Sequence, residues 1–223
     1  MKSLPSIFLV LISGASLVAQ EPVLPLPPAE VIKFLPPAPP GWETVRSTAD
    51  NFLSDWVATN AVREYKFTPP PKSAADPTAP LPPPQFIRIR ITDSGYWPQF
   101  RRLFEGFTPG KSGDAERLLI DSHPAIKVTS TRKVEGKDDE ELARILMLVN
   151  NRFIVQLETT NAQPKDLEDW LKKIDFAKLA RVPSEGVTEI PVPVMIVKID
   201  ELNPKKTRSY PLFWRRGSDP PVP

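Results

Sequence analysis

The chain has 223 residues, of which 40% are hydrophobic and 25% charged, so it can form one compact domain around a core and is not disordered throughout. The absence of cysteine excludes disulfide frameworks, iron–sulfur clusters, thiolate zinc sites and cysteine nucleophiles. A single histidine and a formal net charge of +2 argue against Ser-His-Asp catalysis, multi-histidine metal sites and nucleic-acid binding.

Residues 1–19 have the layout of a secretory signal peptide. Lys2 supplies a positive charge, Ile7–Val18 is apolar, and Ala19 is a small residue suited to cleavage. The apolar run is 12 residues long, whereas a membrane-spanning helix needs roughly 20. We therefore expect an exported protein, periplasmic or extracellular. A cysteine-free exported fold held by its core is typical of a bacterial envelope protein.

Prolines divide the rest of the chain. Of the 29 prolines, eight fall in each of the segments 21–40, 68–84 and 182–223. Proline removes a backbone donor and breaks helices and central strands, so we expect the regular structure between these segments. The predicted organisation is an extended Pro-rich leader at 20–40, an α+β domain at 41–181 with an exposed Pro-rich loop at 68–84, and a Pro-rich C-terminal extension at 182–223.

The first half of the domain is predicted to contain strands and one helix. Gly41-Trp42 starts a short strand that reaches Val45. A helix follows from Ser47, because Phe52, Leu53, Trp56 and Val57 share one helical face. Residues 62–67 and 86–92 alternate between apolar and polar side chains, which predicts two half-buried strands.

The second half continues this pattern. A helix is predicted from Pro98 to Phe107, and two short strands are predicted at 117–121 and 125–129. Residues 142–149 and 152–158 flank Asn150-Asn151, and asparagine tolerates positive φ, so they predict a tight hairpin. A last helix begins at Pro164, with its apolar stripe at Leu167, Trp170, Leu171 and Ile174. Together these elements predict an α+β fold with an antiparallel, meander-like sheet of about six strands and helices packed against it.

Six short stretches, taken in order, resemble a group of small exported bacterial proteins of unknown function. They are Gly41-Trp42, Arg63-Glu64-Tyr65, Ile89–Gly95, His123-Pro124-Ala125, Asn151–Val155 and Ile174–Ala180. That group resembles the PsbP/Mog1 type of α/β/α sandwich. The resemblance covers residues 41–181 and departs at the proline loop and the C-terminal extension. It implies a fold and an envelope location, brings no catalytic residues, and by analogy favours a binding or assembly module.

Two groups of residues are candidate binding sites. Arg88 and Arg90 on a strand, with Arg101 and Arg102 on the next helix, would form a basic patch for anionic polymers or lipid headgroups if they cluster; otherwise they are an ordinary wet surface. In the tail, Pro191–Ile199 is apolar enough to add a strand. Aromatic and cationic residues then follow together, as in segments that anchor to a membrane surface or a partner: Tyr210, Phe213, Trp214, Arg215 and Arg216. The tail either folds back on its own domain, contacts a membrane, or adds a strand to a partner.

Three further groups of residues are candidates for catalysis or metal binding. His123 stands alone, so we interpret it as a turn residue rather than an acid–base group or metal ligand. The acidic run Asp138–Glu141 lacks the pattern of a calcium loop. Asp93, Asp121 and Glu158 could supply a glycosidase-type carboxylate pair only if two of them converge. We assign no catalytic residue, no metal and no cofactor.

The sequence thus favours an exported, non-enzymatic binding or assembly module whose partner is an envelope protein or polymer. Two alternatives stay open. One is a hydrolase of envelope polymers that uses a carboxylate pair, and the other is a peripheral membrane protein attached through its tail.

Overall fold

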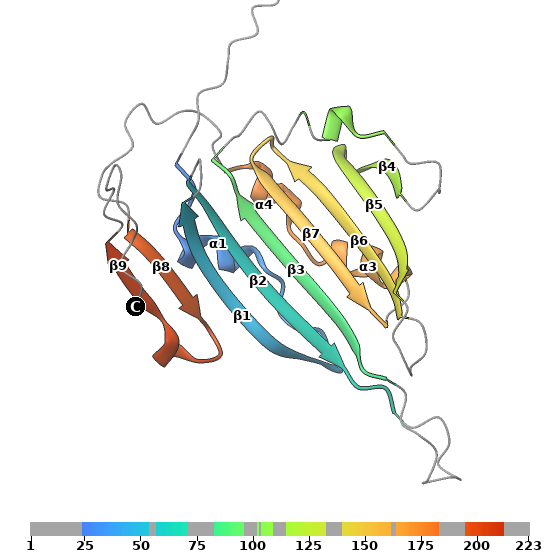
Figure 1. The fold of residues 1–223 in the computed structure, drawn as a ribbon, viewed down its shortest axis with the longest axis horizontal. Coiled ribbons are helices and arrows are strands. Elements are labelled where there is room, and N and C mark those ends of the chain that lie inside the picture. Colours follow the sequence, from blue (N-terminus) through green and yellow to red (C-terminus); the bar gives the residue numbers. More distant parts are fainter. Residues whose placement is uncertain are drawn as a thin grey trace, which may run out of the picture.

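The computed structural model describes residues 24–53, 57–70, 83–95, 102, 104–108, 115–132, 140–161, 164–182 and 195–211. In these residues nine strands form one antiparallel sheet with short helices against it, which confirms the α+β class (Figure 1). The strands are β1 (Trp42–Leu53), β2 (Val57–Phe67), β3 (Gln85–Asp93), β4 (Ala115–Ile120), β5 (His123–Arg132), β6 (Glu140–Val149), β7 (Phe153–Thr160), β8 (Met195–Asp200) and β9 (Arg208–Pro211). The helices are α1 (Pro28–Val31), α3 (Pro164–Leu171) and α4 (Phe176–Ala180), with 3-10 turns η1 (Ile32–Phe34) and η2 (Pro204–Lys206).

The expectation of about six strands in a simple meander is wrong. The strand order is β4-β5-β6-β7-β3-β2-β1-β8-β9, so β7 returns to the centre beside β3, and β8 lies beside β1. Sequential hairpins explain β1-β2-β3 and β4-β5-β6-β7 separately. The β3–β7 pairing joins the two groups, and it depends on residues at least 60 positions apart.

The clearest sequence patterns are confirmed. In β3, the side chains of Ile87, Ile89 and Ile91 are fully buried, as period-two alternation requires. Asn150 and Asn151 have φ angles of 52° and 50° in the turn between β6 and β7, where asparagine is favoured over most residues. The stripe of α3 is also confirmed, because Leu167, Trp170, Leu171 and Ile174 are buried in the main core.

The helix predicted from Ser47 is wrong, because residues 42–53 form the long strand β1. Its core-facing positions include Ser47 and Ala49, which are buried although one is polar and the other small. Because one of these residues is polar and the other small, the apolar–polar alternation typical of a strand is not visible in the sequence. Phe52 and Leu53 instead have the spacing of an apolar helix face. Pairing along the whole hairpin with β2 decides the structure here.

The extended leader predicted at 20–40 is wrong for its second half. Pro28 starts α1 at the first helical position, where its missing N–H is not needed. The proline-free residues that follow complete α1 and η1, and Val31, Ile32 and Leu35 enter the main core. Averaging prolines over 20 positions concealed a segment long enough for two helical turns.

The C-terminal extension also contributes to the sheet. As expected from its apolar residues, the segment around β8 adds a strand, which pairs with Thr48–Asp50 of β1. β9 then pairs with β8 and ends the sheet, and an edge position tolerates Pro211. The folded body therefore extends beyond 41–181 at both ends. The predicted signal peptide lies outside the described residues, among which no helix is long and apolar enough to cross a membrane.

The two faces of the sheet differ. α1, α3 and α4 cover one face, here called the inner face, and enclose the main core (Figure 1). The opposite or outer face carries a smaller core in which Phe104, from the helical residues 104–106, packs on Ile126 and Leu148. Those residues belong to the helix predicted to end at Phe107. The outer sides of β1, β2 and β3 carry mainly polar and charged residues.

Candidate functional site

Five charged side chains cross the outer face in a line, one from each of five neighbouring strands. This ion ladder alternates in sign, and its order is Arg46 (β1), Glu64 (β2), Arg88 (β3), Glu158 (β7) and Arg144 (β6). Each residue stands directly opposite the next in the strand register, where Cβ atoms of antiparallel pairs lie about 4.5–5.5 Å apart. The sheet register alone therefore brings the five charges together.

The distances in the ladder are those of ion pairs. Glu64 Oε1 lies 3.4 Å from Arg46 Nη1 and 2.8 Å from Arg88 Nε. Glu158 Oε2 lies 3.3 Å from Arg88 Nη1, and Glu158 Oε1 lies 2.6 Å from Arg144 Nη2. The three arginines are roughly half exposed, so each pair contributes about 0.2–1 kcal/mol.

A β-bulge at Val45 brings Arg46 into the ladder. The register between β1 and β2 shifts between Thr44 and Arg46. Thr44 and Ser47 therefore both face inward, and Arg46 faces outward opposite Glu64. Because Val45 is taken up as the extra residue, Trp42 and Thr44 before the bulge and Ser47 and Ala49 after it all face inward, while Arg46 stays opposite Glu64.

Of the four arginines of the candidate basic patch, the structure describes Arg88, Arg90 and Arg102. Arg88 and Arg90 do lie on the same face, but two glutamates neutralise Arg88. Arg90 lies near Asp50: burial raises the pKa of that carboxyl, and the nearby cations Lys198, Arg46 and Arg90 oppose the rise. The Arg90 Nε atom is buried without a hydrogen-bond partner among the described residues. Arg102 is exposed, and Arg101 lies outside the described residues.

Of the predicted tail site, the structure describes only the backbone of Tyr210. Tyr210 lies in β9 opposite Ile196 of β8. Phe213, Trp214, Arg215 and Arg216 lie outside the described residues. The part of the tail that is described folds back on its own sheet rather than standing away from it.

The candidates for chemistry do not converge. Asp93 faces the inner side of the sheet and Glu158 the outer side, and Asp121 is exposed at the β4–β5 turn. His123 is the first residue of β5 rather than part of that turn, and burial lowers its pKa against the opposing effect of Asp121. In the part of the chain that the structure describes, no three His, Asp or Glu side chains are grouped to hold a metal ion.

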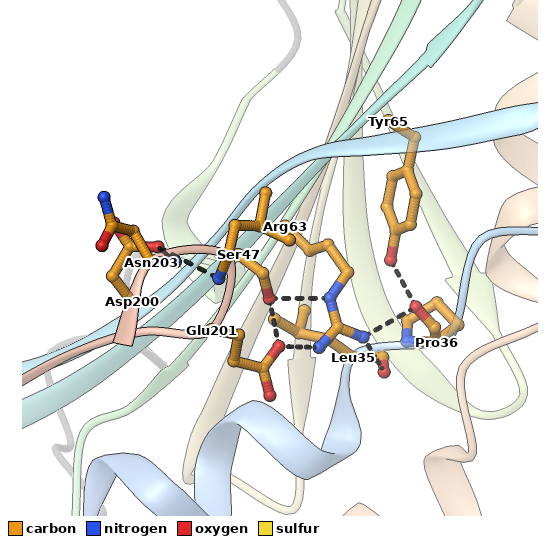
Figure 2. A network of polar contacts seen from close by, with 9 residues as sticks. Leu35, Pro36, Ser47, Arg63, Tyr65, Asp200, Glu201 and Asn203 are labelled. Atoms are coloured by element: carbon orange, nitrogen blue, oxygen red, sulfur yellow. Dashed lines mark hydrogen bonds and ion pairs between the residues drawn. The ribbon is translucent and has the colours of Figure 1, made fainter. Parts of the chain in front are cut away.

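A polar network around Arg63, which the sequence analysis missed, joins three separate segments (Figure 2). The guanidinium of Arg63 donates to Ser47 Oγ at 2.9 Å and to the carbonyl oxygens of Leu35 and Pro36 at 2.8 and 3.0 Å. It also pairs with Glu201, which in turn accepts from the Ser47 hydroxyl. Arg63 thus fastens the leader and the turn after β8 to the β1–β2 hairpin.

Tyr65 adds a second contact to the leader. Its side chain is fully buried, with its ring 4.3 Å from that of Trp170, and its hydroxyl donates to the carbonyl oxygen of Pro36 (Figure 2). Burial raises the pKa of Tyr65. Arg63 and Tyr65 fall in the strand predicted at 62–67 and in one stretch of the family resemblance, but neither pattern indicates which distant segments their side chains contact.

A pocket of about 290 Å³ opens on the inner side, at the end of the sheet where β1 begins and β2 ends. We call it the end pocket. Trp42 and Phe67 form one wall, with ring centroids 5.5 Å apart, and Trp170 of α3 meets Trp42 edge-on at 5.2 Å. Polar side chains complete the lining: Gln85, Asp166, Asp169 and Lys173. A second depression, of about 280 Å³, lies at the Arg144–Glu158 end of the ladder.

Comparisons of the chain with protein-family models, with curated proteins and with solved structures found no match. The interpretation of the ion ladder and the end pocket therefore depends on their own geometry.

Proposed function

We propose that this protein is an exported, non-enzymatic binding module of the bacterial cell envelope with a PsbP/Mog1-type fold. The outer face, along the ion ladder, would hold its partner. The observation that carries the proposal is the asymmetry of the sheet: helices cover the inner face, while the ladder lies across five strands with three half-exposed arginines.

The ladder favours a polar partner. Its charges alternate and are already paired, so a hydrophobic partner would have to bury them, which is unfavourable. A partner with matching charges can exchange ion pairs with Arg46, Arg88 and Arg144 at little desolvation cost, because these side chains keep contact with water. Such binding weakens as salt rises.

Reversing two charges tests the proposal. In the variant with both Arg88→Glu and Arg144→Glu, Glu158 is left between two acids. We expect purified wild-type protein to sediment with isolated envelope fragments in low salt and the double variant to remain in solution. The matched control is Lys205→Glu on the exposed turn η2, which lies outside the ladder. Circular dichroism confirms that each variant is folded.

Two results would contradict the proposal. Equal sedimentation of the double variant and the wild type would show that the ladder is not the contact surface. Retention of the full-length chain in the cytoplasm, with residues 1–19 intact, would show that the protein is not exported.

A further inference from the structure

The end pocket combines an aromatic wall with hydrogen-bonding groups of both signs. Trp42 and Phe67 are half-buried and line the pocket together with Trp170 of α3, whose ring meets that of Trp42 edge-on. The lining also includes the charged residues Asp166, Asp169 and Lys173. We propose that the end pocket binds one ring of a neutral saccharide.

The aromatic wall suits the apolar side of a sugar ring. Aromatic rings carry negative charge on their faces, and the C–H groups of a pyranose carry weak positive charge, so the two surfaces attract when stacked. The pocket, at about 290 Å³, is near the lower end of the usual range for ligand sites, roughly 300–1,000 Å³. It therefore accommodates a single ring of a longer chain.

The polar lining discriminates between ligand classes. The lining carries two carboxylates and one ammonium group, so it disfavours an anion, and Lys173 offsets part of the attraction of Asp166 and Asp169 for a cation. A proline-rich peptide would stack on the aromatic rings, but its prolines carry no N–H and so could not donate to the polar groups of the lining. Sugar hydroxyls both donate and accept, so they can satisfy carboxylates, an ammonium group and the Gln85 amide together.

Two hydrogen bonds involve residues that line the pocket. Asp169 Oδ1 accepts one from Lys172 at 2.8 Å, in a pair whose side chains are both exposed. The backbone N–H of Trp42 donates to the Pro39 carbonyl at 3.0 Å, so the leader fixes the entrance beside the aromatic wall. Preorganised groups lose little conformational freedom on binding.

This site is independent of the proposed partner face. Trp42 and Phe67 face the inner side of the sheet, and the ladder faces the outer side. Failure of either proposal therefore leaves the other standing, and the Arg88→Glu, Arg144→Glu double variant should bind saccharides as the wild type does.

The test is an NMR titration of the full mature chain that follows the indole N–H signals. The probes are maltotetraose, cellotetraose and chitotetraose, with tetramethylammonium as the cationic comparison. We expect at least one oligosaccharide to shift the signals of Trp42 and Trp170 in a saturable way, with Trp42 assigned through Trp42→Phe. Because each variant removes one polar contact, Asp166→Ala and Gln85→Ala should weaken that binding about fivefold.

The matched control is Glu168→Ala, an exposed position of α3 outside the pocket lining, which should leave the affinity unchanged. The proposal is overturned if none of the three oligosaccharides shifts either signal, or if tetramethylammonium does so at lower concentration than every sugar. It is equally overturned if the Asp166 and Gln85 variants bind as tightly as the wild type.

Discussion

Arg152 holds both carboxylate oxygens of Asp93 inside the protein. Its Nε donates to Oδ1 and its Nη2 to Oδ2, each at 2.8 Å, and the Asp93 side chain has no exposed surface. The backbone N–H groups of Leu26 and Gly95 also donate to this carboxylate, at 2.8 and 3.0 Å. The pair thus ties the end of β3, the β6–β7 turn and the start of the leader to one another.

Removing one charge of this pair should destabilise the whole fold. In Asp93→Asn the guanidinium of Arg152 stays buried without its counter-ion, which costs about 3–5 kcal/mol when a buried pair is broken on one side. Urea unfolding followed by tryptophan fluorescence measures the change. The control is Asp121→Asn, at an exposed turn position with positive φ that asparagine also tolerates. A loss below about 1 kcal/mol for Asp93→Asn would contradict the role assigned to the pair.

The leader should behave as part of the core. Ile32 is 4% exposed and belongs to the main core cluster, so Ile32→Ala should lower the free energy of unfolding by about 2–5 kcal/mol. Lys33→Ala, the next position on the exposed side, should change it by less than about 0.5 kcal/mol. Chemical denaturation measures both values. If the two variants were equally stable, α1 and η1 would not be packed as described.

Tyr65 should make the fold sensitive to alkali. Burial raises its pKa above the ordinary value of 10.0, so above pH 10 the unfolded chain loses the phenolic proton while the folded chain keeps it. The free energy of unfolding therefore falls as pH rises above 10. Tyr65→Phe should cost about 1 kcal/mol at neutral pH, because the Pro36 carbonyl retains its bond from Arg63.

The check is a series of urea titrations between neutral pH and pH 11. Tyr65→Phe should lose less stability over the alkaline part of the range than the wild type. Parallel curves for the two proteins would show that the Tyr65 hydroxyl does not titrate later in the folded state.

His123 should act in the opposite pH range. Burial lowers its pKa below 6.5, with Asp121 acting against the change. As pH falls through 6.5, the unfolded chain gains a proton that the folded chain does not, so the free energy of unfolding falls with it. His123→Gln should remove this part of the acid sensitivity. Thermal melts of both proteins between pH 7.5 and pH 5 test it, and an unchanged slope in the variant would contradict it.

Local patterns in the sequence were sufficient for elements whose neighbours are set by the chain itself. The alternation of Ile87, Ile89 and Ile91, the Asn150-Asn151 turn and the stripe of α3 each depend on residues a few positions apart, and all three are confirmed. Patterns averaged over long windows were less informative. The proline count concealed α1, and two apolar residues at the end of β1 imitated a helix.

In the candidate sites, too, local sequence patterns were sufficient for some features and not for others. Sequence alternation placed Arg88 and Arg90 on a common outward side of β3, but it carried no information about which strands flank β3. The register with β2 and β7 decides that Glu64 and Glu158 stand beside Arg88, so Arg88 belongs to a ladder of alternating charges. Trp42 and Trp170 lie 128 positions apart in the chain, and only the packing of α3 on the first hairpin brings them into one pocket.

The sequence by itself excluded cysteine-based sites and determined the α+β class. It also determined the individual central strands and the sides on which their residues lie, because these follow from residue types and short periodicities. The tertiary structure decided the strand order, the use of the leader and tail, the ion ladder and the end pocket. Each of these depends on contacts between distant segments, whose free energy comes from burial and pairing across the whole sheet and leaves no local periodic trace.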